Sequence, residues 1–183
     1  STTLFWFGLG LTFLVLHVFV ELKVAKEPMM NLNLFTNPTF LNASLVGYVA
    51  TVALFGAEFL MPIYLQAFRG RSALDAGLIL LAVAATSAVA TPLAGRLFDK
   101  IGPRAIMVTG FVILCINTWQ LSKIEGTTSI NYIVFLLALR GLAVGLTMQT
   151  SYVTALSSIP LNLLPRGSSL LNSTRSVVQA VWV

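Results

Sequence analysis

Charged residues are scarce in this sequence. They make up 9% of its 183 residues, whereas 57% are hydrophobic and the mean hydropathy is +0.89. A soluble domain carries about 25% charged residues, so this chain lacks the polar groups that would cover its surface in water. The shortage excludes a water-soluble protein and indicates an integral membrane protein, with the lipid bilayer as a partner.

Cysteine and histidine are also nearly absent. The sequence has one of each, Cys115 and His17, so it offers neither an internal disulfide framework nor a Cys/His cluster for a metal. It has no P-loop, no G-x-G-x-x-G fingerprint and no catalytic triad, and we expect no cofactor, no metal and no enzymatic activity. The net charge of +5 does not indicate nucleic-acid binding, because the basic residues fall singly between apolar runs.

The apolar runs are long enough to cross a bilayer, which takes about 20 residues. They predict an all-α, polytopic transmembrane helix bundle of about six spans. The expected organisation is an extra span at 1–20, a polar cytoplasmic connector at 21–39, and a partial six-helix half at 40–183 with spans at about 40–68, 76–94, 105–121, 130–159 and 167–183, the last of them truncated.

The stretch Gly95-Arg-Leu-Phe-Asp99-Lys100-Ile-Gly102-Pro-Arg104 orients these spans. Four of its ten residues are charged, and it lies between two apolar runs. Short basic loops resist translocation, so we expect a cytoplasmic turn that joins two antiparallel helices at the plasma (inner) membrane.

Three charged residues lie inside predicted spans: Glu58, Arg140 and Arg175. Such a charge at mid-membrane costs about 2.5–3.5 kcal/mol on insertion scales. Each belongs to a polar stripe at helical spacing, so each stripe should face protein or water. Glu58 and Arg140 both lie about ten residues from an outer span end, or roughly 15 Å deep. We hypothesise that they pair, directly or through water, and that Glu58 carries a proton; the alternative is a static ion pair or a hydrogen-bonded, protonated Glu.

Several motifs together resemble one family. The stretch 95–104 is similar to the G-x-L-x-D-R/K-x-G-x-R/K signature of the major facilitator superfamily. Arg140-Gly-Leu-Ala-Val-Gly145 is similar to the motif of arginine and glycine in that family's fourth helix, or to its counterpart in the tenth. Leu60-Met-Pro-Ile-Tyr-Leu-Gln66, the following Ser72-Ala-Leu-Asp-Ala-Gly-Leu78 and the pair Asn172 and Arg175 resemble the fourteen-span drug:proton antiporters of the EmrB/QacA type.

This resemblance implies a fragment from the second half of a transporter, whose partners are the missing N-terminal half of the same polypeptide, a small-molecule substrate and protons. It implies a proton-coupled antiporter that exports hydrophobic or cationic drugs by alternating access. The alternatives are an exporter of an endogenous metabolite, lipid or siderophore, and a non-transporting membrane scaffold. The expected proton-coupling residues are Glu58 and Arg140; the cavity residues are Thr51, Phe55, Met148, Gln149, Tyr152 and Arg175; the gating loop contains Gly95, Asp99, Lys100, Gly102 and Arg104.

Overall fold

The computed structural model describes residues 8–10, 12–13, 16 and 31–182. From residue 31 onward its elements are η1 (Leu32–Thr36), α2 (Pro38–Ile63), η2 (Tyr64–Phe68), α3 (Ala73–Ile101), α4 (Pro103–Leu121), α5 (Ile130–Ser157), η3 (Leu161–Leu163) and α6 (Leu164–Trp182). The predicted all-α class is confirmed. The predicted span at 1–20 and the connector at 21–39 lie largely outside the described residues.

Four helical stretches in the described part of the chain are long and apolar enough to cross a membrane. They are Pro38–Phe68, Ala73–Ile101, Pro103–Leu121 and Ile130–Ser157, which cover the spans predicted at 40–68, 76–94, 105–121 and 130–159. The chain is therefore an integral membrane protein. The fifth long helix, α6, occupies most of the span predicted at 167–183. It is not one of the four apolar helices, because its polar residues lower its hydropathy.

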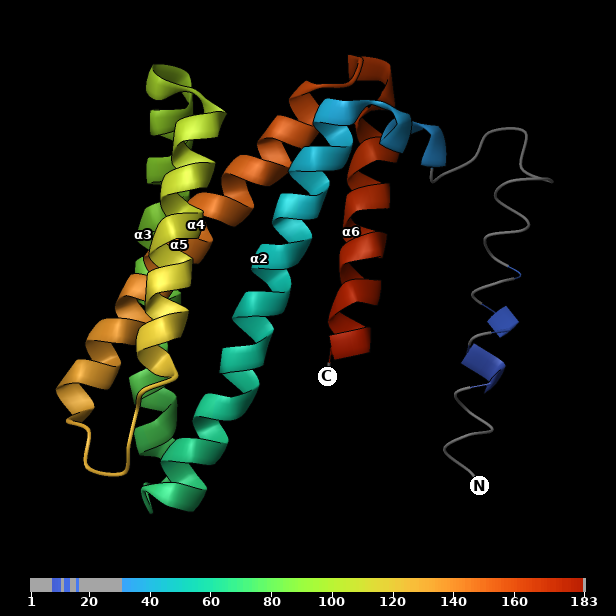
Figure 1. Cartoon of the computed structure of the whole chain (residues 1–183). Helices are drawn as coiled ribbons and strands as arrows, with labels where there is room; N and C mark the ends of the chain where they lie inside the picture. Colours follow the sequence, from blue (N-terminus) through green and yellow to red (C-terminus); the bar gives the residue numbers. More distant parts are fainter. Residues whose placement is uncertain (1–7, 11, 14–15, 17–30, 183) are drawn as a thin grey trace.

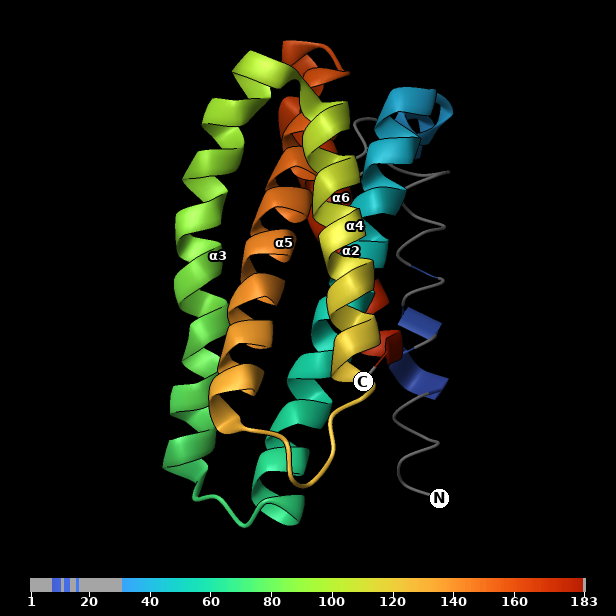
Figure 2. The same cartoon turned by 60° about the vertical axis from the view of Figure 1, so that its left-hand side comes forward.

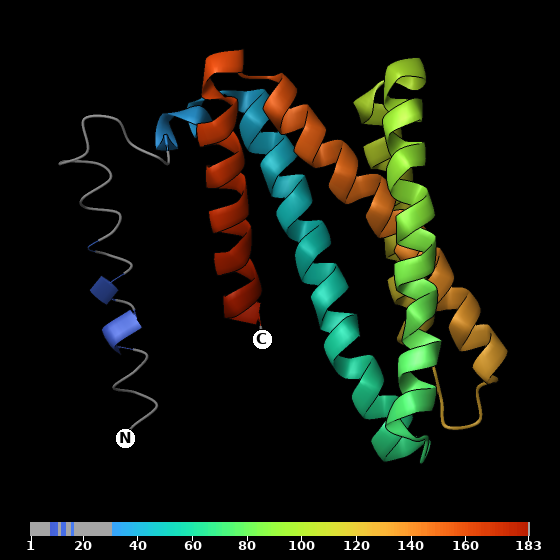
Figure 3. The same cartoon turned by 180° about the vertical axis from the view of Figure 1, so that it is seen from behind.

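The helices alternate in direction, as successive membrane crossings require. In Figure 1, η1, the α3–α4 turn and η3 lie at the top of the view, whereas the loops at 69–72 and 122–129 lie at the bottom. α5 runs obliquely through the bundle, from beside α3 and α4 at the lower end to beside α2 and α6 at the upper end (Figures 2 and 3). It is the most buried of the four apolar helices.

Small residues let α5 approach α3 closely. A Cβ at Gly141 would collide with the Thr86 hydroxyl and the Val83 carbonyl, and one at Gly145 would lie 2.8 Å from the Ala90 Cβ. Val83 and Ala90 are buried and seven residues apart, so they lie on one face of α3. Close backbone approach through small residues is the usual packing mode of membrane helices, where lipid supplies no hydrophobic driving force.

The predicted loop at 95–104 is mostly helix, which corrects the sequence-based interpretation. α3 continues to Ile101, α4 begins at Pro103, and only Gly102 separates them. Its φ of +78° favours glycine, and its N–H closes α3 by donating to the Phe98 carbonyl at 3.1 Å. The charges therefore mark where α3 leaves the apolar layer rather than where the helix ends.

Replacing Gly141 by Ala in the full-length protein should destabilise the bundle by about 1–3 kcal/mol, because the added methyl group overpacks the α3–α5 contact. Thermal unfolding of the purified protein in detergent measures this change. Gly77→Ala on α3 is the matched control, since nothing lies within 4 Å of its added Cβ. Equal unfolding temperatures for the two variants would contradict the close packing.

Candidate functional site

A cavity of about 390 Å³ lies among four helices, α2, α3, α5 and α6. We name it the central cavity. The structure brings four of the predicted cavity residues together here: Met148, Gln149 and Tyr152 of α5, and Arg175 of α6. The remaining lining residues are Leu54, Ser87, Thr91, Val144, Gly145 and Asn172.

Arg175 ties α6 to α2 at the edge of this cavity. Its Nε donates to Thr51 Oγ1 at 3.1 Å. Thr51 is fully buried, and its hydroxyl donates to the Gly47 carbonyl at 2.8 Å. Thr51, predicted as a cavity residue, therefore positions Arg175 and does not itself line the central cavity. The neighbouring Thr174 hydroxyl is hydrogen-bonded to the Tyr48 hydroxyl of α2 and reinforces the same contact.

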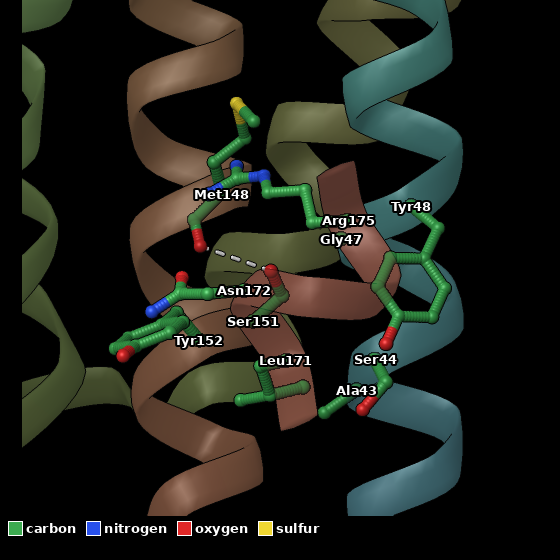
Figure 4. Close-up of a pocket in the computed structure, with 10 residues that line it drawn as sticks. All are labelled: Ala43, Ser44, Gly47, Tyr48, Met148, Ser151, Tyr152, Leu171, Asn172 and Arg175. Carbon is green, nitrogen blue, oxygen red and sulfur yellow. Dashed lines mark hydrogen bonds between the residues drawn. The ribbon is translucent and has the colours of Figure 1, made fainter. Parts of the chain in front are cut away.

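A narrower crevice adjoins the central cavity between α2, α5 and α6 (Figure 4). It shares Met148, Tyr152, Asn172 and Arg175 with that cavity. In Figure 4 the Arg175 side chain reaches from α6 toward Met148 on α5, and Asn172 and Tyr152 are directed to one side of the crevice. The crevice and the central cavity are therefore continuous, and the residues that they share include polar and aromatic side chains.

Arg140 occupies a different place in the bundle. It is only 2% exposed, and its guanidinium donates to Asn117 Oδ1 at 3.3 Å, to Thr118 Oγ1 at 3.4 Å and to the Ala53 carbonyl. Its Nε is buried and has no hydrogen-bond partner in the part of the chain that the structure describes. Arg140 also borders a second, mainly apolar cavity of about 410 Å³ between α2 and α4. It joins α5 to α2 and α4 rather than lining the central cavity.

Asn117 is a residue that sequence reasoning missed. It is fully buried, accepts from Arg140, and donates from Nδ2 to the Leu136 carbonyl at 2.7 Å. The sequence did contain a signal for it, namely an amide side chain in the middle of an apolar span. In membrane helices such a side chain usually faces a neighbouring helix and hydrogen-bonds to it.

Glu58 is exposed on α2, and the expected direct pairing with Arg140 is not found: the Arg140 guanidinium binds Asn117, Thr118 and Ala53 instead. The two charges are nonetheless close enough to interact electrostatically. Glu58 and Phe55 line neither the central cavity nor the second cavity.

The residues predicted to form a gating loop lie at the α3–α4 end. Asp99 and Lys100 are exposed in the last turns of α3, and Arg104 is exposed in the first turn of α4. A Cβ at Gly95 would meet nothing within 4 Å, so within the described residues no helix approaches that glycine. The charged groups are presented outward, where a further segment would have to reach them.

Comparison with known proteins gives one consistent family. The family model for the Major Facilitator Superfamily matches residues 2–183. The uncharacterised MFS-type transporter YcnB of Bacillus subtilis is 30% identical over 97% of this chain and 37% of its own length. The lincomycin resistance protein LmrB of Listeria innocua is 30% identical over 92% of this chain and 36% of its own length. The multidrug transporter protein MdtP of Bacillus subtilis is 31% identical over 78% of this chain and 26% of its own length.

The chain thus spans about a third of the length of YcnB and LmrB. No solved structure gives a significant match.

Replacing Asn117 by Leu should destabilise the full-length protein by about 1–3 kcal/mol, because it removes an acceptor from the buried Arg140 and leaves the Leu136 carbonyl without that donor. Thr109→Val on the same helix is the control, since the exposed Thr109 hydroxyl bonds only the Ala105 carbonyl of its own helix. Thermal unfolding in detergent compares the two variants. A smaller loss for Asn117→Leu than for the control would refute the bridging role.

Proposed function

Because this chain belongs to the Major Facilitator Superfamily, we propose that it is part of a proton-coupled antiporter that exports hydrophobic small molecules by alternating access. The observation that carries this proposal is the central cavity. Polar and aromatic side chains from several helices surround it within a bundle of membrane-spanning length. Such a lining is costly against lipid, and it suits a hydrated path for a substrate.

The lining favours hydrophobic molecules with some polar groups. Leu54, Val144 and Met148 give apolar contact, and Met adapts to varied shapes; Gln149 and Tyr152 add hydrogen-bonding groups. The printed names of two relatives, a lincomycin resistance protein and a multidrug transporter protein, support a drug-like substrate. The sequence also suggested cationic drugs, but among the described residues no acidic side chain lines this cavity, so cationic substrates are left out of the proposal.

We assign proton coupling to Glu58, whose charge would influence Arg140. Glu58 is the one acidic residue within the four described apolar helices outside their terminal turns. Pro62 cannot donate a backbone hydrogen bond to the Glu58 carbonyl, so α2 is weakened at this level, and it continues as the π-helical segment η2. A proton on Glu58 would change the field at the Arg140 guanidinium and thereby the contact between α2, α4 and α5.

For the whole protein, we place this chain in the second half of a fourteen-span transporter of the EmrB/QacA type. The α3–α4 turn would face the cytoplasm at the plasma membrane, where Asp99 would pair with a basic residue or cap a helix N-terminus in the other half. The relatives' greater length supports such a partner half. Export of an endogenous metabolite, lipid or siderophore, and a scaffold role without transport, are the alternatives that the experiment below separates.

Glu58→Gln in the full-length protein should reduce pH-gradient-driven export of the neutral dye Nile red at least about 10-fold, while dye exchange without a gradient continues. Proteoliposomes with an imposed pH gradient measure both. Glu125→Gln, in the exposed 122–129 loop, is the matched control. Unchanged coupling in Glu58→Gln would remove that residue from the mechanism. Absence of any dye movement in the wild type would favour a narrower substrate or a scaffold.

A further inference from the structure

We propose that the central cavity recognises an anionic group on its substrate, and that the Arg175 guanidinium binds this group. The inference rests on the proposed function and names the substrate class of the same site: a small molecule with an apolar or aromatic body and one carboxylate or similar anion.

The first observation behind this inference is the charge of the cavity lining. Among the described residues, Arg175 is the only charged one that lines the central cavity or the adjoining crevice. The acidic residues of the described chain lie elsewhere: Glu58, Asp75, Asp99 and Glu125. The described lining therefore presents one uncompensated positive charge.

The second step is the hydrogen-bonding capacity of Arg175. Its Nε is held by Thr51 Oγ1 at 3.1 Å, which fixes the plane of the guanidinium. Its two terminal nitrogens have no protein partner within the described residues, and the side chain is half-buried rather than sealed. A guanidinium held in this way presents a fork of donors that matches both oxygens of a carboxylate.

Arg140 shows by contrast what a structural arginine looks like in this bundle. It is almost fully buried, and its terminal nitrogens are used by Asn117, Thr118 and Ala53. Within the described residues, only Nε of Arg175 is hydrogen-bonded to the protein, and Arg175 borders both the central cavity and the adjoining crevice. Of the two, Arg175 is the one available to a ligand.

The neighbouring side chains define the rest of the ligand. The amides of Gln149 and Asn172 line the same cavity as Arg175 and offer further donors for an anion. Leu54 and Val144 line the same cavity and suit an apolar body, and the Tyr152 ring adds an aromatic surface. A volume of about 390 Å³ accommodates a molecule of drug-like size.

Three probes that share a naphthalene ring and carry a negative, a neutral or a positive polar group test the proposal: 2-naphthoate, 2-naphthamide and 2-naphthylmethylammonium. Their binding to the full-length protein in nanodiscs is measured by equilibrium dialysis. We expect 2-naphthoate to bind about 10-fold more tightly than 2-naphthamide, as charge-assisted hydrogen bonds allow, and the ammonium probe to bind most weakly. Arg175→Gln should remove the preference for 2-naphthoate, and it should weaken the binding of 2-naphthoate far more than that of 2-naphthamide.

Two further variants separate recognition from misfolding. Arg175→Lys keeps the charge and should keep part of the preference, whereas Arg71→Gln, in the exposed 69–72 loop, should leave all three affinities unchanged. The proposal is overturned if the wild type binds no 2-naphthoate, if it binds the ammonium probe equally well, or if Arg175→Gln keeps the preference. Nile red export without an anion preference would overturn this inference alone; an anion preference without proton-driven export would overturn the proposed function alone.

Discussion

A guanidinium buried among membrane-spanning helices constrains this bundle. Arg140 has almost no exposed surface, so its charge has to be satisfied by side chains and carbonyls of the neighbouring helices. The Asn117 amide and the Thr118 hydroxyl on α4 and the Ala53 carbonyl on α2 meet that need. Since these groups have to converge on one point of α5, they fix the relative height of three helices.

The close contact between α3 and α5 complements this constraint. Gly141 directly follows Arg140, and both it and Gly145 lie against α3 without room for a side chain. α5 is thus pressed against α3 on one face and joined to α2 and α4 by its arginine on another. The central cavity opens along α5 from Val144 to Tyr152, a stretch that includes the Gly145 contact, and residues of α2, α3 and α6 form its other walls.

Hydropathy predicted most of the fold, because apolar length located the four long helices. Arg175 belongs to the polar stripe predicted on the last helix and lines the central cavity, whereas Met148, Gln149 and Tyr152 line it from beside the stripe that contains Arg140. Depth alone could not place Glu58, because it gives the height of a residue and not its direction around the helix. At about 100° per residue, Glu58 falls on the same face as Thr51, well away from Ala53, whose carbonyl meets Arg140. Charge density could not reveal that α3 continues to Ile101, because polar residues mark the edge of the lipid layer and not the end of a helix.

The two arginines meet the same short segment of α2. Arg175 donates to Thr51, Arg140 donates to the carbonyl of Ala53, and Glu58 lies less than two turns beyond on the same helix. Because Thr51 and Ala53 lie two residues apart on different faces, a displacement or rotation of α2 alters both contacts together. Under the two proposals, an anion bound by Arg175 and a proton on Glu58 would therefore both act on α2. This shared helix would give the proposed substrate binding and the proposed protonation a physical means of influencing each other without direct contact between the two ligands.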